Sequence, residues 1–489
     1  MTDDKIDARF TRGSTMRHVA VMTATSAVGL MSLFLVDLAN LFYISLLGQT
    51  ELAAAIGFAG TIQFFMISVS IGLAIAATAT VSRAVGRGSR EDARRLAASS
   101  LVILVAVLGV VSIAVWLFRE SALRLLGAEG QALTIASDFL AIVLPTLPLL
   151  GIGMVSSGLL RSVGDARRAM YVTLAGGLFG AILDPFFIFD WGLGLGVDGA
   201  AIVSALSRVL VAAVGLGFAL RIHDLIGRPS VSGIRKDTRS ILDIALPAVA
   251  TQLSTPFGNA YLISVVSGFG DEAVAGWAVV GRLTALGFGG IFALSGSVGP
   301  IFGQNLGAGL PDRIAATYRD ALIFAAGYVG VVWFLLFILT APLGEAFGLT
   351  GAGLDVLWAF THFGAGAFLF TAALFVSNSA FNNLGHPTWS TGLNWSRDAA
   401  AIPILALIVG TSAGAIGVVI VQALAGVIVG SGAIVVAGRF VRNLARTGVR
   451  AAEPPIPMAE AAPFSSGRST SITIANADDD PLDTPGENH

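Results

Sequence analysis

Long apolar stretches, each broken by only a few polar residues, follow one another through most of the chain. A helix needs about 20 apolar residues to cross the hydrocarbon core of a membrane. Glycine and proline occur within these stretches, as lipid-embedded helices allow. We therefore expect an all-α membrane protein with twelve transmembrane helices, at 18–44, 53–82, 96–118, 136–160, 170–189, 199–220, 241–267, 274–303, 320–341, 356–382, 393–410 and 416–438.

The connections between these stretches alternate in charge. One set holds most of the arginines, including Arg83, Arg95, Arg161 and Arg313. The intervening connections hold few cations and several acids, such as Asp190. Because arginine-rich connections face the cytoplasm, we expect both termini there, which requires an even number of spans.

Composition narrows the class of protein further. Hydrophobic residues make up 55% of the 489 residues, charged residues only 12%, and the mean hydropathy is +0.81. Since a soluble domain carries roughly 25% charged residues, most of this surface must face lipid. A net charge of −2 offers no field to attract nucleic acid, and the absence of cysteine excludes disulfides and thiolate metal sites. The preference for arginine over lysine is typical of a GC-rich bacterial genome, which predicts a bacterial inner (plasma) membrane.

The two halves of the apolar region resemble each other at a shift of about 221 residues. Gly86, Arg87 and Gly88 align with Gly307, Ala308 and Gly309 in this way. Parallel repeats place a substrate cavity between two lobes. We expect two pseudo-symmetric lobes of six spans each, with a cytoplasmic N-terminal segment at 1–17, an N-lobe at 18–220, a cytoplasmic linker at 221–240, a C-lobe at 241–440 and a disordered cytoplasmic tail at 441–489.

Four polar residues within the N-lobe spans are candidates for binding a coupling ion. A charge at membrane depth costs about 2.5–3.5 kcal/mol, which makes Asp37 in the first span a functional candidate, with Asn40 one turn later on the same face. Asp184 precedes Pro185, whose missing N–H releases a carbonyl oxygen. A carboxylate beside carbonyl oxygens suits sodium or a proton, and Ser204 offers another neutral oxygen. The alternative is that these groups are structural hydrogen-bond partners, or that Asp184 is solvated at the interface.

Other polar residues at depth suit a cavity or a gate. Arg282 and Arg397 are the cations, and Gln252 and Asn259 are the polar residues of the seventh span. Asp398 follows Arg397 directly, so we expect the two side chains to point apart on an α-helix and to need separate partners.

Motifs for enzymatic or nucleotide chemistry are missing from the sequence. It contains no phosphate-binding loop, no HExxH, no nucleophile elbow and no dinucleotide fingerprint. We therefore expect no enzymatic activity and no cofactor. Transport would be driven by an ion gradient, in which one charge crossing 100 mV supplies about 2.3 kcal/mol.

Several patches carry a resemblance to a known family, and it extends over nearly all of 18–440. They are Val81–Gly86 with Glu91–Arg95, Leu160–Asp165, Leu183–Pro185 with Gly196–Ala201, Leu246–Ala248, and Gly303–Gly309 with Asp312–Arg313. In this order and spacing they resemble the multidrug and toxic compound extrusion (MATE) family.

The resemblance implies twelve helices in two lobes and export of cationic amphipathic compounds against protons or sodium. Asp184 falls on a family acid, whereas the family's first-span Asp corresponds to Asn40 and the carboxylate here is Asp37. The family's Asn four residues before Asp184 is Gly180. Acids are also missing from the seventh and tenth spans, so the chain resembles most the DinF-like branch, which couples through its N-lobe.

We therefore expect a monomeric antiporter in the lipid bilayer that exports small organic cations in exchange for protons or sodium. The nearest alternative is a lipid-linked oligosaccharide flippase of the same superfamily, which needs several basic residues to hold a pyrophosphate. Arg282 and Arg397 are the two available. A membrane-embedded enzyme or receptor is the third interpretation, and an enzyme would need a second catalytic group at depth.

Overall fold

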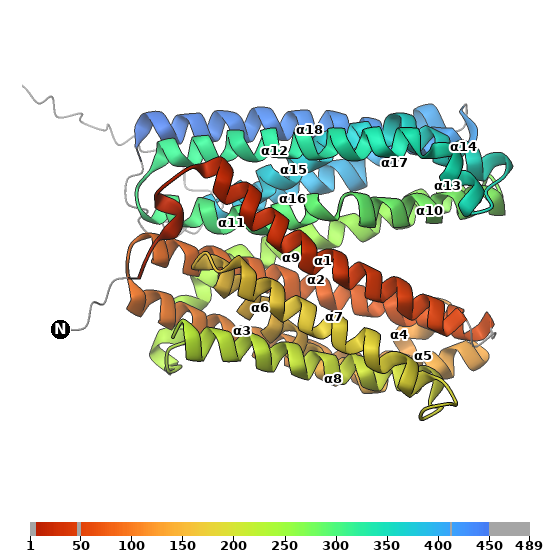
Figure 1. The fold of residues 1–489 in the computed structure, drawn as a ribbon, viewed down its shortest axis with the longest axis horizontal. Helices are drawn as coiled ribbons and strands as arrows, with labels where there is room; N and C mark the ends of the chain where they lie inside the picture. Colours follow the sequence, from red (N-terminus) through yellow and green to blue (C-terminus); the bar gives the residue numbers. More distant parts are fainter. Residues whose placement is uncertain (1–5, 46–49, 411–412, 449–489) are drawn as a thin grey trace, which may run out of the picture. The chain divides into compact units, whose positions relative to one another are not determined.

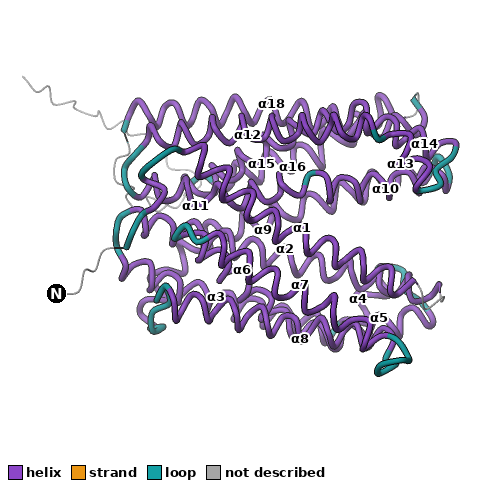
Figure 2. The backbone as a smooth tube through the Cα atoms, in the orientation of Figure 1, coloured by secondary structure: helices purple, strands orange, loops and turns teal. Residues whose placement is uncertain are grey.

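Helices account for nearly all of the residues that the computed structural model describes, which are 6–45, 50–410 and 413–448 (Figures 1 and 2). Of the disordered tail expected at 441–489, residues 449–489 lie outside the described residues, whereas 441–447 are the last residues of a helix. The helices are η1 (Arg9–Thr11), α1 (Thr15–Ser45), α2 (Thr50–Gly86), α3 (Arg90–Leu117), α4 (Arg119–Leu125), α5 (Gly130–Val143), η2 (Leu144–Thr146), α6 (Leu147–Ser162), α7 (Ala166–Ile188), α8 (Gly196–Gly217), η3 (Phe218–Ile222), α9 (Val231–Ser267), α10 (Asp271–Gly287), α11 (Gly289–Gly307), α12 (Pro311–Ile338), α13 (Thr340–Ala346), α14 (Gly351–Ala359), η4 (Phe360–Gly364), α15 (Ala365–Leu384), α16 (Pro387–Trp395), η5 (Ser396–Ala401), α17 (Ile402–Leu405), η6 (Ala406–Gly410) and α18 (Gly414–Thr447).

The spans expected from the sequence all fall on helical runs of the described chain. By length and apolar composition, nine of the described runs can cross a membrane, and the bent pair α10–α11 makes ten. The other two expected spans are α9 and the run 387–410, where polar residues lower the mean hydropathy. The expected all-helical membrane protein is confirmed.

The outer surface of the bundle is apolar. Val110, Ile113 and Leu117 on α3, and Phe334 and Ile338 on α12, are each more than half exposed. Water would penalise such a surface by roughly 25 cal/mol for each square ångström of apolar area. A surrounding bilayer removes this penalty, which explains how so few charges suffice.

Each half of the chain packs mostly within itself. In Figure 1, α2 to α8 form one group and α10 to α18 the other, and each group has its own buried cores. The end of the bundle that carries Arg83, Arg90, Arg161 and Arg313 is called the arginine-rich end below. The two groups lie close together there and diverge toward the opposite end (Figure 1).

The first long helix of each half crosses to the other half. Val19 and Met22 of α1 are buried in the core of the second half, against α11. Ile241 and Ile244 of α9 are buried in a core of the first half, against α2 and α3. The other ends return to their own halves, since α1 packs on α7 and Leu262 of α9 lies in the core of the second half.

A hydrogen bond of the same kind forms at each crossing. The Thr15 hydroxyl donates to Oδ2 of Asp320 (2.5 Å), and the Ser99 hydroxyl donates to Oδ2 of Asp237 (2.8 Å). Ser99 and Asp320 occupy equivalent positions at the repeat shift, and Thr15 and Asp237 are equivalent with one residue of offset. The two crossings therefore use the same device with donor and acceptor exchanged.

The connection between the halves is largely docked on α3. Only 223–230 lie outside helices, because α9 begins at Val231, inside the expected linker of 221–240. Asp224 forms an ion pair with Arg94 (2.5 Å), and the N–H of Gly227 donates to the carbonyl of Arg94 (3.0 Å). Most of this connection therefore belongs structurally to the first half.

Candidate functional site

The carboxylate of Asp184 is buried inside α7, with the residue only 2% exposed. Pro185 follows within the same helix. Proline has no N–H, so Pro185 cannot donate to the carbonyl oxygen of Ala181. A buried acid and a carbonyl oxygen released from the helical ladder therefore lie within one turn of α7, as the sequence indicated.

Asp184 faces α1 across Gly180. A Cβ atom built on Gly180 would lie 3.6 Å from Oδ2 of Asp184 and 3.6 Å from Cγ1 of Val36. The glycine therefore leaves space between the carboxylate and α1. Asp37 and Asn40 lie in the helical part of α1, but their side chains lie outside the described residues. Joint ion binding by the four candidates stays a prediction, as does a sodium site at Asp184.

Ser204 is half-buried on α8, which packs against α7. One turn later, the Ser207 hydroxyl donates to the carbonyl of Gly176 on α7 (2.9 Å). Since α7 and α8 form an antiparallel pair, Ser204 lies about one turn nearer to Asp184 than Ser207 does.

A buried arginine that sequence reasoning missed, Arg208, lies one turn beyond Ser204. It is 8% exposed and donates to the carbonyl of Val143 (2.7 Å), the hydroxyl of Thr146 (3.0 Å) and Oε1 of Gln63 (2.9 Å). These acceptors lie where α5 breaks into η2, and on α2. The sequence does indicate this residue, because Arg208 is a charged residue within the expected span 199–220.

Arg397 and Asp398 bond to each other, so the expectation that they point apart is wrong. Nε and a terminal nitrogen of Arg397 donate to the two carboxylate oxygens of Asp398, at 2.8 and 3.0 Å. Both residues lie in the π-helical turn η5, where neighbouring side chains diverge less than on an α-helix. A Cβ atom on Gly258 would lie 3.0 Å from Cγ of Asp398, so the pair packs against α9.

The other cavity candidates are more accessible. Arg282 on α10 and Asn259 on α9 are exposed, and Gln252 on α9 is half-buried. Their roles in a cavity or gate stay predictions.

The two halves are joined at the arginine-rich end by a reciprocal pair of contacts. Arg83 at the end of α2 donates to the carbonyls of Asn383 (3.0 Å) and Asn382 (3.2 Å) at the end of α15. Gln304 at the end of α11 donates to the carbonyl of Ser162 (2.6 Å) at the end of α6. Arg83 and Gln304 are equivalent at the repeat shift, as are Ser162 and Asn383, so one contact mirrors the other.

Glycines allow this close approach. A Cβ atom on Gly86 would overlap the carbonyl oxygen of Gln304, and one on Gly307 would overlap the carbonyl oxygen of Arg83. Gly86 and Gly307 are again equivalent positions. The ends of α2 and α11 therefore touch backbone to backbone.

The segment before α1 covers this contact. Phe10 is buried and its N–H donates to Oε1 of Gln304 (2.8 Å). Arg313 donates to the carbonyls of Phe10 (2.8 Å) and Gly13 (2.9 Å). The arginine-rich end is therefore closed by the reciprocal contacts and by the N-terminal segment.

A family model described as MatE matches residues 26–186 and again residues 247–407. The second match begins and ends 221 residues after the first, so the expected internal repeat is confirmed.

Two curated proteins are similar over much of the chain. A FAD transporter of Shewanella oneidensis is 31% identical over 338 residues, which cover 67% of this chain and 73% of that protein. A probable multidrug resistance protein NorM of Thermotoga maritima is 26% identical over 290 residues, covering 58% of this chain and 61% of that protein.

The fold is also found among solved structures. The outward-facing conformation of a multidrug resistance MATE family transporter of the MOP superfamily matches with a TM-score of 0.84 at 22% identity. The match covers 91% of this chain and 99% of that one. At this identity the likeness shows the fold alone.

Proposed function

This chain belongs to the MATE family of membrane transporters, and we propose that it is a secondary antiporter that exports small organic cations in exchange for protons or sodium. The coupling ion would bind at Asp184 and Asp37, with Asn40 and Ser204 as neutral partners. The buried acid of α7, facing α1 beside a proline, is the observation that carries this proposal. Coupling through the first half also fits the DinF-like branch of the family.

The proposal includes the organisation expected from the sequence. The arginine-rich end would face the cytoplasm with both termini, and the lobes at 18–220 and 241–440 would act as a monomer. Closure of one end by Arg83 and Gln304 supports alternating access, because a transporter must seal one side while the other is open.

A flavin dinucleotide is the second candidate substrate. The similarity to the Shewanella FAD transporter favours it, because that match combines 31% identity with coverage of two thirds of this chain. FAD carries a pyrophosphate, and the exposed cation Arg282 on α10 is available to an anion. The multidrug resistance protein of Thermotoga supports the organic cation instead.

Purified protein in liposomes, preloaded with a cationic dye or with FAD, separates these functions. We expect dye movement when a pH gradient or a sodium gradient is imposed alone, and Asp184→Asn should reduce the rate to that of protein-free liposomes. An amide has the size of the carboxylate but can neither bind a cation by charge nor carry a proton. Asp198→Asn, an exposed acid in the first turn of α8, is the matched control and should transport normally.

Each outcome bears on the proposal. Full transport by Asp184→Asn contradicts the site. Movement of FAD without movement of dye selects the second substrate. If neither compound moves under either gradient, the remaining function is that of a lipid-linked oligosaccharide flippase. That function would be assayed with a fluorescent polyprenyl pyrophosphate.

A further inference from the structure

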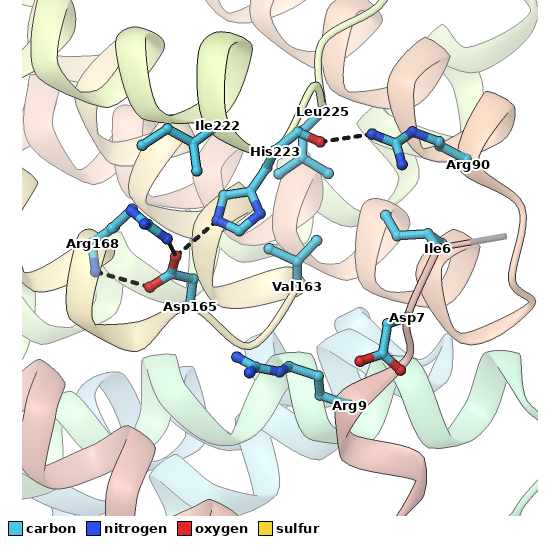
Figure 3. Close-up of a pocket in the computed structure, with 10 residues that line it drawn as sticks. All are labelled: Ile6, Asp7, Arg9, Arg90, Val163, Asp165, Arg168, Ile222, His223 and Leu225. Atoms are coloured by element: carbon cyan, nitrogen blue, oxygen red, sulfur yellow. Dashed lines mark hydrogen bonds and ion pairs between the residues drawn. The ribbon is translucent and has the colours of Figure 1, made fainter. Parts of the chain in front are cut away.

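Two adjoining cavities of about 530 Å³ each lie at the arginine-rich end, beside the first turns of α1 and α7. They share Asp7, Arg9 and Asp165. Figure 3 shows the first cavity, where His223 and Arg168 both reach toward Asp165. The second lies between the N-terminal segment, α1 and α7.

The shared acid Asp165 is already neutralised. The Arg168 guanidinium approaches Oδ2 of Asp165 at 2.5 Å, and the backbone N–H of Arg168 donates to Oδ1 (3.1 Å). His223 Nε2 lies 2.8 Å from Oδ2 (Figure 3). Burial acts to raise the pKa of Asp165, but the hydrogen bonds from His223 and Arg168 outweigh it and hold this pKa below its usual value. Asp165 therefore has no charge left for other cations.

The second cavity has more arginines than acids in its lining. Arg9, Arg12, Arg17 and Arg167 line it and are exposed, and none of them forms an ion pair with a carboxylate among the residues that the structure describes. Apart from Asp165, Asp7 is the one acid in its lining. The cavity therefore presents an excess of positive charge on three separate segments of chain.

An apolar wall continues from these arginines along the helices. Val21 and Met22 line the same cavity, and Val21 is 54% exposed. Two turns farther along α1, Val28 is also 54% exposed, and Tyr171 on α7 is 49% exposed. A ligand with an anionic head and long apolar chains matches this surface, whereas a soluble anion would use the arginines alone.

We propose that the α1–α7 groove, formed by Arg12, Arg17 and Arg167 with the wall of Val21 and Val28, binds an anionic phospholipid of the cytoplasmic leaflet. The headgroup phosphate lies among the guanidinium groups, and the acyl chains lie along α1. Basic pockets between transmembrane helices on the cytoplasmic side are suited to such headgroups.

The site also touches the closure of the arginine-rich end. The carbonyl of Arg12 accepts from Arg313 (3.2 Å) and from Nε2–H of His18 (2.7 Å), so the backbone of the N-terminal segment is fixed next to the groove. A phosphate held by Arg12 stabilises this segment over the contact between the halves. Bound lipid therefore favours the state that is closed at this end.

Lipid titration of the full-length protein in detergent tests the proposal. Dioleoyl phosphatidylglycerol should raise the melting midpoint of the wild type, and dioleoyl phosphatidylcholine should not. The variant Arg12→Gln/Arg17→Gln/Arg167→Gln should bind phosphatidylglycerol on the order of 100-fold more weakly, since each arginine near a lipid surface contributes about fivefold. Arg17→Gln alone should lose about fivefold, which keeps the test informative if the triple variant folds poorly.

The matched control removes three exposed arginines that line neither cavity, as Arg228→Gln/Arg235→Gln/Arg239→Gln. It should respond to phosphatidylglycerol like the wild type. Equal losses in both triple variants, or none in the groove variant, overturn the proposal. Inorganic phosphate and glycerol 3-phosphate should cause no shift, and a shift equal to that from phosphatidylglycerol would assign the groove to a soluble phosphate instead.

Discussion

Arg208 binds at a break in a neighbouring helical run, where two prolines interrupt the helical hydrogen bonds. Pro145 and Pro148 cannot donate to the carbonyls four residues before them, Ala141 and Leu144. Trp116 and Ser112 of α3 donate to these two carbonyls instead. At the same break, the carbonyl of Val143 is accessible to the Arg208 guanidinium. A charge inside the bundle is therefore tolerated because a broken helix supplies acceptors for it.

Replacing Arg208 with lysine should destabilise the protein by about 1–3 kcal/mol. A guanidinium reaches the break and Gln63 at once with its planar fork, whereas an ammonium cannot span both, so one buried acceptor loses its donor. The melting midpoint in detergent measures this. Arg221→Lys, an exposed position just after α8, is the control and should melt like the wild type. Equal midpoints for both variants would show that the fork geometry at Arg208 is irrelevant.

For single residues, the sequence predicted which polar groups are buried in the spans better than it predicted which groups they bond to. Asp184 is buried in its span next to Pro185, as its position indicated. Arg397 and Asp398 were expected to need separate partners, because a π-helical turn has no recognisable signature in a single sequence. The partners of Arg208 come from α2 and from the break after α5, and span prediction places neither beside it.

Among the elements, α2 and α11 make the closest approach between the halves. Their ends touch through Gly86 and Gly307, because any side chain there would overlap a carbonyl oxygen of the other helix. Glycine within a helix costs about 0.5–1 kcal/mol relative to alanine. The close contact, together with the hydrogen bonds of Arg83 and Gln304, offsets that cost.

Gly86→Ala and Gly307→Ala should each destabilise the closed state by about 1–3 kcal/mol, the usual cost of overpacking. The melting midpoint in detergent should fall for both. Gly296→Ala is the control, because a Cβ atom at this α11 position meets open space and alanine favours the helix. It should be neutral or stabilising. A fall in midpoint for Gly296→Ala equal to that for Gly86→Ala would contradict the role of the contact.

The elements themselves were largely predictable, and their crossings were not. Long apolar runs predict the helices, and the shift of 221 residues identifies Gly86 and Gly307 as equivalent positions. The crossing of α1 and α9 depends on pairs such as Thr15 with Asp320, which lie far apart in the sequence. Hydropathy carries no information about such pairs.

For the molecule as a whole, the crossed helices limit how the halves can rock in the proposed alternating access. The first turns of α1 are packed in the core of the second half, and α1 is also packed on α7 of the first half. In α9, Val249 touches Gly72 of α2, and Gly258 touches Asp398 of the second half, with Pro256 between them. Opening the arginine-rich end therefore requires both crossed helices to bend, and a proline is available in α9.

A distance measured between the halves tests this motion directly. Spin labels at Glu91→Cys and Asp312→Cys occupy equivalent exposed positions in the first turns of α3 and α12, and the chain has no cysteine of its own to interfere. The closed state should give one short distance.

Adding Gly86→Ala or Gly307→Ala should raise the ratio of open to closed molecules by about 5- to 150-fold, because a loss of 1–3 kcal/mol in the closed state corresponds to that factor. A longer distance should then appear, whereas Gly296→Ala should leave the short one. If both glycine variants kept the single short distance, the halves would be held by the crossed helices and the N-terminal segment rather than by the contact of α2 with α11.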